Sequence, residues 1–246
     1  MSKIYDALKR AEREREIARD RGDRDSHDVR DNGHPLESNG RNGHEDDDYR
    51  RLRASLLFAP AYSDVRTIAV TATRHGEGAT RVAVGLARAL AGEGDTRVLL
   101  VEANLRTPSF AQKLPVAKAP GLNDFLAGEA SAPSLIAPVR EWNLSAISAG
   151  YRSAVIDCEA IASAVAEVMN QFDFVILDLP PVTRYADATI LAPKVDGVIL
   201  VVEADRTPVG DAESAKKSLD RVGARIFGVV LNRRRHYVPA TLQALL

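Results

Sequence analysis

Apolar runs alternate with amphipathic stretches along most of the chain from residue 67 onward. Runs rich in Val, Ile and Leu predict strands over residues 67–72, 97–103, 174–180, 197–204 and 226–232. Helical spacing between these runs predicts helices over residues 78–92, 154–171, 188–195 and 208–222. Strands that are apolar throughout are covered on both faces, as in parallel sheets. We therefore predict an α/β fold, a doubly wound and mainly parallel sheet with helices on both faces.

The first 48 residues show a different pattern. Residues 1–21 place Ile4, Ala7 and Leu8 on one side of a short amphipathic helix that is otherwise charged. Such a helix suits docking on a partner, and a frayed charged helix is an equal alternative. Residues 22–48 hold few large aliphatic side chains and predict a disordered linker. We expect the folded domain to span residues 49–246, beginning with a helix that ends before Pro60.

Composition narrows the classes of partner. Lys plus Arg (33) nearly equal Asp plus Glu (34), so net charge predicts no nucleic-acid partner. A run of about 18 apolar residues, as a membrane span requires, does not occur in the sequence. We expect a cytoplasmic protein with no direct membrane span, which a membrane partner could recruit. The single cysteine, Cys158, is expected to be a buried and inert thiol.

The stretch TATRHGEGATRVAVGLARAL, residues 71–90, has the pattern of a phosphate-binding loop between a strand and a helix. Its predicted nucleotide-binding residues are Gly76, Glu77, Gly78, Ala79, Thr80 and Arg81. Glycines let backbone amides approach an anion, and Thr80 supplies a hydroxyl for Mg²⁺. Ala79, however, stands where such loops carry a lysine that reaches the terminal phosphates. Arg74, His75 or Arg81 could supply positive charge in place of that lysine. The alternative is that the stretch is an ordinary glycine-rich turn that binds no phosphate.

Three further segments carry a family resemblance. VLLVEANLRTPSF, FDFVILDLPPV and GVVLNRR follow the loop in order. Together with the loop they resemble the bacterial tyrosine kinases of capsule and exopolysaccharide synthesis, within the MinD/ParA-like group of P-loop ATPases. The resemblance covers nearly the whole chain except the linker. It implies ATP or ADP with Mg²⁺ as the cofactors.

The resemblance also implies roles for individual residues. Glu102 and Asn104 occupy the positions of two family aspartates that serve Mg²⁺ and catalysis, so both catalytic positions are altered. Asp178 matches the retained Walker B aspartate, which makes Thr80, Glu102 and Asp178 the expected Mg²⁺ set. Asn232 matches an asparagine that contacts adenine in the family.

A second group of residues bears on assembly. Asp47, Arg50 and Arg53 resemble the glutamate and two arginines through which family members form a ring, although a solvated charged face is the alternative. The tail offers one tyrosine, Tyr237, as a possible phospho-acceptor, where the family carries a tyrosine cluster.

Three functions remain open on these grounds. The favoured one is a catalytically impaired kinase-like subunit that assists a membrane-anchored polysaccharide co-polymerase. The second is an active tyrosine autokinase with an altered loop, and the third is a MinD/ParA-like positioning ATPase. The absence of a lysine at Ala79 leaves enzymatic activity undecided at this stage.

Overall fold

The structure is a computed structural model of the 246-residue chain. It describes residues 43–57, 64–92, 95–116, 119–150, 154–234. The predicted N-terminal helix over residues 1–21, the predicted linker up to residue 42 and the candidate acceptor Tyr237 all lie outside the described residues.

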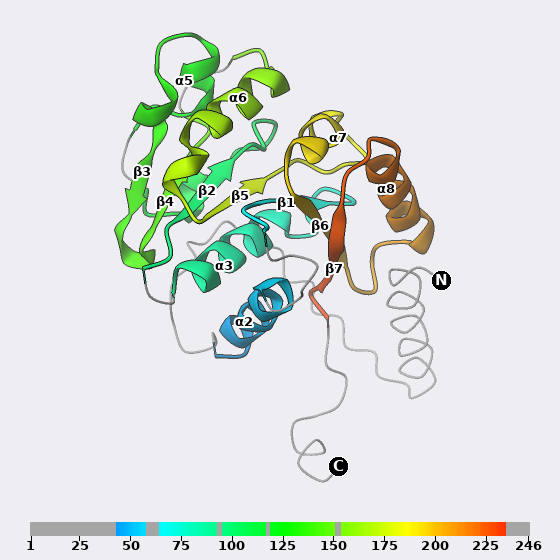
Figure 1. The fold of residues 1–246 in the computed structure, drawn as a ribbon. Helices are drawn as coiled ribbons and strands as arrows, with labels where there is room; N and C mark the ends of the chain where they lie inside the picture. The colour runs from blue at the N-terminus through cyan, green and yellow to red at the C-terminus, as the bar shows by residue number, and fades with distance from the viewer. Residues whose placement is uncertain (1–42, 58–63, 93–94, 117–118, 151–153, 235–246) are drawn as a thin grey trace, which may run out of the picture.

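A seven-stranded sheet forms the centre of the molecule (Figure 1). The strands are β1 Thr67–Ala72, β2 Val98–Glu102, β3 Ala137–Val139, β4 Leu144–Ile147, β5 Phe174–Asp178, β6 Gly197–Glu203 and β7 Ile226–Asn232. Their spatial order is β3-β4-β2-β5-β1-β6-β7. Every neighbouring pair is parallel except β3 and β4, which are antiparallel. The predicted mainly parallel sheet is confirmed.

Helices cover both faces of this sheet. The α-helices are α2 Gly43–Leu57, α3 Ala79–Ala91, α4 Phe110–Lys113, α5 Leu122–Leu126, α6 Cys158–Val168, α7 Asp187–Leu191 and α8 Val209–Arg221. Alternate strand residues enter two separate apolar cores, because successive side chains of a strand point to opposite faces. In β5, for example, Val175 and Leu177 join the core under α6, α7 and α8, whereas Ile176 joins the core under α2 and α3. The predicted doubly wound arrangement is therefore also confirmed.

Two predicted helices have different bounds in the structure. Helix α6 begins at Cys158 rather than residue 154, because the carboxylate of Asp157 accepts hydrogen bonds from the amides of Glu159 and Ala160 and caps the helix there. The helix predicted over residues 188–195 changes to a 3₁₀ turn at Ala192–Lys194, which contains a proline. The sequence analysis also missed β3, β4, α4 and α5, all of three to five residues.

Helix α2 begins at Gly43, inside the segment that the sequence analysis assigned to the linker through Asp48. Acidic side chains at Asp46, Asp47 and Asp48 favour the start of a helix through its dipole. The helix packs against α3, where the ring of Tyr49 occupies the space that a side chain at Gly85 would need. The hydroxyl of Tyr49 donates to the carbonyl of Arg81 at 3.3 Å, so α2 contacts the helix that follows the loop.

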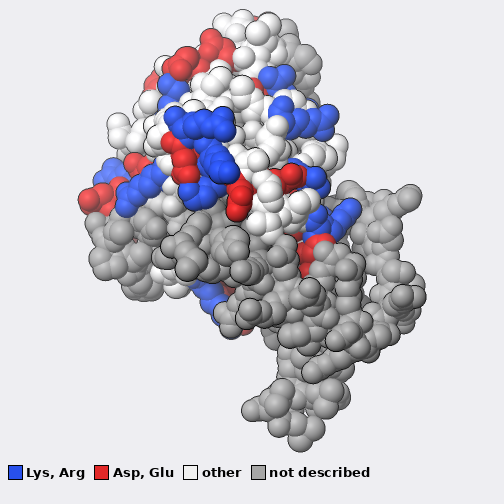
Figure 2. Space-filling model, turned by 90° about the vertical axis from the view of Figure 1, so that its right-hand side faces the viewer, with Lys and Arg blue, Asp and Glu red and all other residues white. Residues whose placement is uncertain are grey.

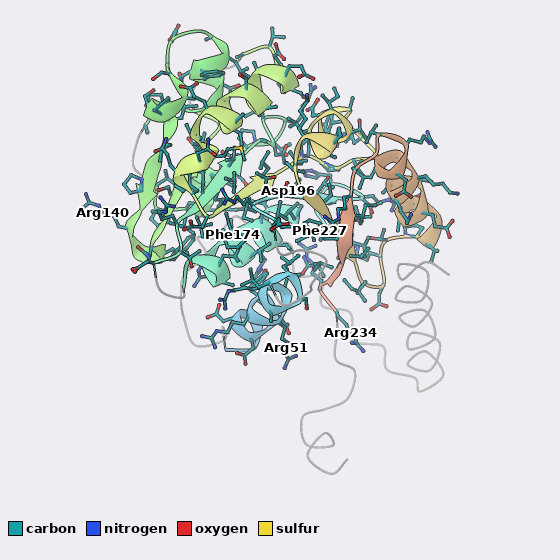
Figure 3. The ribbon with its side chains drawn as sticks, viewed as in Figure 1. Arg51, Arg140, Phe174, Asp196, Phe227 and Arg234 are labelled. Atoms are coloured by element: carbon teal, nitrogen blue, oxygen red, sulfur yellow. The ribbon has the colours of Figure 1, made fainter. Side chains whose placement is uncertain are left out.

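The two ends of the sheet differ in chemistry. At the amino ends, Asp196 accepts hydrogen bonds from the amides of Arg66 and Thr67 and from the Thr67 hydroxyl, which ties the start of β1 to that of β6 (Figure 3). The carboxyl ends carry Glu102, Asp178, Glu203 and Asn232 as the last residues of β2, β5, β6 and β7. In open α/β sheets, ligands bind in the crevice at the carboxyl ends. The structure thus gathers the candidate site residues at one edge.

The length of the helices and the distribution of surface charge are relevant to membranes and to charged partners. Within the described residues, the structure contains no helix long and apolar enough to cross a membrane. On the face shown in Figure 2, basic and acidic side chains of the described residues are interspersed.

Candidate functional site

The loop between β1 and α3 has the backbone of an anion cradle. Gly76 and Gly78 have φ angles of 87° and 93°, in the left-handed region that favours glycine. Gly78 is also the residue that precedes α3, and it provides no side-chain cap for the first amides of that helix. Uncapped amides at a helix N-terminus carry partial positive charge, and they suit a phosphate group.

Three contacts hold this loop in place. The buried carboxylate of Glu77 accepts a hydrogen bond from the amide of Arg74 at 2.8 Å and another from the hydroxyl of Thr207 at 2.5 Å. The carbonyl of Glu77 accepts a third, from the side-chain amide of Asn232 at 2.8 Å. Burial raises the pKa of Glu77 above its ordinary value, and the hydrogen bonds from Thr207 and Arg74 oppose that rise. The loop is thereby tied to the segment after β6 and to the end of β7.

Asn232 thus has a defined contact in the structure. Its amide group lies against the loop, close enough that a side chain at Gly78 would meet the Asn232 nitrogen at 2.3 Å. Its oxygen accepts a hydrogen bond from the amide of Arg233 at 2.9 Å. Contact with adenine, which the family resemblance implies, stays a prediction; the contact that the structure shows is with the loop.

Thr80 and Asp178 form a polar pair at the start of α3. The Thr80 hydroxyl donates to Asp178 Oδ2 at 2.7 Å, and Asp178 Oδ1 has no hydrogen-bond partner within the described residues. Burial raises the pKa of Asp178 to about 7; the hydrogen bond from Thr80 opposes the rise, and the nearby charge of Glu102 adds to it. A buried carboxylate oxygen without a partner is costly unless a cation or a donor satisfies it.

Glu102 lies beside Asp178 in the register of β2 and β5, but its carboxylate has other partners. One oxygen accepts hydrogen bonds from the amides of Ser109 and Phe110, the latter at 2.6 Å. The other accepts from the amide of Ala149 at 2.9 Å. Burial raises the pKa of Glu102, and these amide bonds oppose it. The longer arm of glutamate therefore braces two loops, and its role as a Mg²⁺ ligand stays a prediction.

Asn104 and Arg106, which follow Glu102 in the segment VLLVEANLRTPSF, form hydrogen bonds with other residues of the protein. The side chain of Asn104 exchanges hydrogen bonds with Thr107 at 3.2 and 3.3 Å, forming a small turn. Arg106 forms a paired contact with Asp187 at 2.9 and 3.0 Å, which joins this motif to α7. The hydrogen bonds that Arg106 donates to Asp187 raise the pKa of Arg106 further above its ordinary value, so this cation stays charged.

A cavity of about 660 Å³ opens in front of the loop. Its walls include the whole predicted loop, and on the facing side Asn104, Ser109 and Lys113. A second hollow of about 460 Å³ shares Arg74–Glu77 with it, and its other side contains Glu203, to which Arg206 and Arg233 pair at 3.3 Å each. A volume of this size suits a small-molecule ligand.

The loop and the start of α3 fit a nucleoside diphosphate with Mg²⁺, but Ala79 and Asn104 each lack a charged group that the family resemblance implies. The glycine loop and the uncapped helix start suit the phosphates, whereas Thr80 and the unpartnered Asp178 Oδ1 suit a hydrated Mg²⁺. Ala79 adds no charge at the position from which a lysine would reach the phosphates. Of the flanking cations, Arg74 pairs with Asp211 at 2.5 Å and so faces α8.

The predicted assembly residues lie on α2. Asp47 and Arg50 pair with each other at 3.3 Å, and their side chains are 55% and 70% exposed, so they face solvent within the described part of the chain. Arg53, one turn further, is half-buried. A contact with a neighbouring subunit stays a prediction for these three residues.

The fold and the loop define a P-loop nucleotide-binding protein, and comparison with known proteins gives its family. A model of the ParA family, described as NUBPL iron-transfer P-loop NTPase, matches residues 64–244. The chain therefore belongs to the ParA-like family of P-loop NTPases.

Its relatives include bacterial tyrosine-protein kinases. The tyrosine-protein kinase YwqD of Bacillus subtilis (strain 168) is 27% identical over 191 residues, which cover 76% of this chain and 80% of that protein. The succinoglycan biosynthesis transport protein ExoP of Rhizobium meliloti (strain 1021) is 32% identical over 192 residues, 75% of this chain but only 24% of ExoP. The crystal structure of the chimerical protein CapA2B2 superposes with a TM-score of 0.69 at 25% identity, covering 77% of this chain and 85% of that one.

Proposed function

We propose that this protein is a tyrosine-kinase-like subunit of exopolysaccharide or capsule synthesis and export that transfers phosphate poorly. In this role it is a cytoplasmic regulatory or assembly partner of a membrane-anchored co-polymerase. The kinases and the succinoglycan protein among its relatives support the pathway. The observation that carries the impaired chemistry is Ala79, in a loop whose backbone is otherwise formed as a phosphate cradle.

The missing lysine at position 79 would raise the free energy of the transition state for phosphoryl transfer. A positioned cation or donor at developing charge is worth about 3 kcal/mol or more, on the order of 100-fold in rate. The methyl group of Ala79 supplies none of this. Asn104 adds to the loss, because an amide has neither the charge that holds Mg²⁺ nor the basicity that accepts a proton.

In this proposal the protein still binds nucleotide. Thr80 and Asp178 would hold Mg²⁺, and the backbone amides of the loop would hold the phosphates. ATP would supply the phosphoryl group, and Glu102 would shape the site through the backbone it braces. The charged stripe of Asp47, Arg50 and Arg53 on α2 would contact a neighbouring subunit in a ring.

One observation favours the second candidate, an active autokinase. The hydrogen bond between Thr80 and Asp178 supports it, because it places a hydroxyl and a carboxylate together where a phosphoryl-transfer enzyme would hold Mg²⁺. In that case Tyr237 or a partner's tyrosine would be the acceptor.

Deletion and complementation in the source bacterium test the proposed pathway. Deleting the gene is expected to change the amount or chain length of an exported polysaccharide, and the unaltered gene is expected to restore it. A complementing gene with Arg50→Glu and Arg53→Glu would restore it less well if the stripe on α2 assembles the subunit, with Arg221→Glu on α8 as the control. An unchanged polysaccharide profile after deletion would contradict the assignment.

A further inference from the structure

Lys113 lies on the wall of the cavity that faces the loop. It ends the short helix α4, and it lines the same cavity as Ala79 and Thr80. The sequence analysis considered only cations that flank the loop in sequence, and Lys113 is more than 30 positions away from Ala79 along the chain. The fold brings its segment back across the front of the site.

The position of Lys113 is fixed by its neighbours. Phe110, at the start of α4, is fully buried in the core beneath α3. The amides of Ser109 and Phe110 donate to the carboxylate of Glu102 at the end of β2. This bracing holds the segment that carries Lys113 against the sheet edge, beside the Mg²⁺ side of the site.

Lys113 lies near the two buried carboxylates at this edge of the sheet. Burial raises the pKa of both Asp178 and Glu102, and the charge of Lys113 is a lesser effect that opposes the rise. No close ion pair joins Lys113 to another residue in the described part of the chain. Its ammonium therefore stays available to an anionic ligand in the cavity, where it would meet phosphates bound by the loop.

We propose that Lys113 provides, from the facing wall, the ammonium that contacts the β- and γ-phosphates of a bound nucleotide in place of the side chain missing at Ala79. This inference rests on the proposed function, in which nucleotide is bound but little phosphate is transferred. A cation on the facing wall attracts the phosphates in the ground state and in the transition state alike. Such uniform binding raises affinity without accelerating the chemical step.

Calorimetric titration of the full chain with Mg-ATP, Mg-ADP and AMP tests the inference. Lys113→Met is expected to weaken ATP and ADP binding by about tenfold, the usual scale for a hydrogen bond to a charged group. AMP has no β- or γ-phosphate, so its affinity should change little. Lys217→Met, on the exposed side of α8, is the matched control and should bind all three as the unaltered protein does.

A rescue variant separates a phosphate contact from a structural role. Adding Ala79→Lys to Lys113→Met should restore ATP affinity, because a lysine then reaches the phosphates from the loop. If Lys113 served only as a counter-ion for Asp178 and Glu102, its replacement would lower the melting temperature of the free protein and leave the ratio of ATP to AMP affinity unchanged.

Three outcomes would overturn the inference: unchanged ATP affinity in Lys113→Met, equal losses for ATP and AMP, or no nucleotide binding by the unaltered protein. The first two outcomes would leave the proposed function intact, whereas the third would also contradict the nucleotide binding that the proposed function includes. Rapid tyrosine phosphorylation by the unaltered protein would contradict the proposed function, and it is measured separately from affinity.

Discussion

The Thr80 hydroxyl donates a 2.7 Å hydrogen bond to Asp178 Oδ2 and so joins the first turn of α3 to the end of β5. The two residues are 98 positions apart in sequence, and the other oxygen of Asp178 is buried without a described partner. The pair lies next to a loop in which Ala79 stands where P-loops carry a lysine. Under the proposed function, the protein would therefore bind nucleotide without rapid phosphoryl transfer.

Replacing Thr80 with valine should destabilise the free protein. The change removes the donor and leaves both buried oxygens of Asp178 without a partner, at a cost of about 1–3 kcal/mol. Urea denaturation measures the free energy of unfolding. Thr189→Val, which removes an exposed hydrogen bond to the carbonyl of Ala186, is the control and should change stability by less than about 0.5 kcal/mol. Equal effects of the two variants would refute the account of this pair.

Glu102 is expected to act through the backbone of its neighbours. Glu102→Asp shortens the arm by one methylene, so the carboxylate can no longer reach the amides of Phe110 and Ala149 together. Hydrogen exchange at these amides should then be faster by about tenfold. Glu213→Asp on α8 is the control. Unchanged exchange at both amides would show that Glu102 does not brace these loops.

Gly78 is required by both conformation and space. Alanine there would have to adopt a φ of 93°, and its Cβ would lie 2.3 Å from the Asn232 nitrogen. We expect a loss of about 1–3 kcal/mol in the free energy of unfolding, together with weaker nucleotide binding. Gly210→Ala is the control, because nothing lies within 4 Å of its Cβ position in α8. A Gly78→Ala protein as stable as the Gly210→Ala protein would contradict the strained loop.

Asp196 predicts a pH dependence of stability. Burial would raise its pKa, but the hydrogen bonds from Thr67 and Arg66 outweigh burial, and the pKa lies below its ordinary value of 3.8. Its contribution to stability is thus present above pH about 4, and it is lost as pH falls through the lowered folded-state pKa. The melting temperature of Asp196→Asn should be below that of the unaltered protein at pH 7, and the gap should narrow toward pH 3. A gap that is constant with pH would contradict this assignment.

The sequence predicted the elements with strong periodicity and missed those without it. The five long parallel strands and the helices α3, α6 and α8 have apolar patterns that local analysis detects. Strands β3 and β4 have three and four residues, too few for a periodic apolar pattern. They depend on pairing with each other, and β4 also pairs with β2.

Glu102, Asp178 and Asn232, which the family motifs singled out, lie at the carboxyl ends of β2, β5 and β7, and their roles in the site stay predictions. The motifs did not identify the bracing role of Glu102, the contact between Asn232 and the loop, or the position of Lys113. Each of these depends on segments that are distant in sequence and adjacent only in the fold. The anchoring of Glu77 by Thr207, which lies 130 residues further on, belongs to the same group.

The missing ammonium at position 79 is expected to limit phosphoryl transfer. Purified protein and an Ala79→Lys variant can be incubated with radiolabelled ATP and Mg²⁺, and the phosphotyrosine formed can be counted. We expect little or no label on the unaltered protein. Labelling of the lysine variant should be faster, on the order of 100-fold. Rapid tyrosine labelling of the unaltered protein, with no gain from the added lysine, would show that the chain is a working kinase.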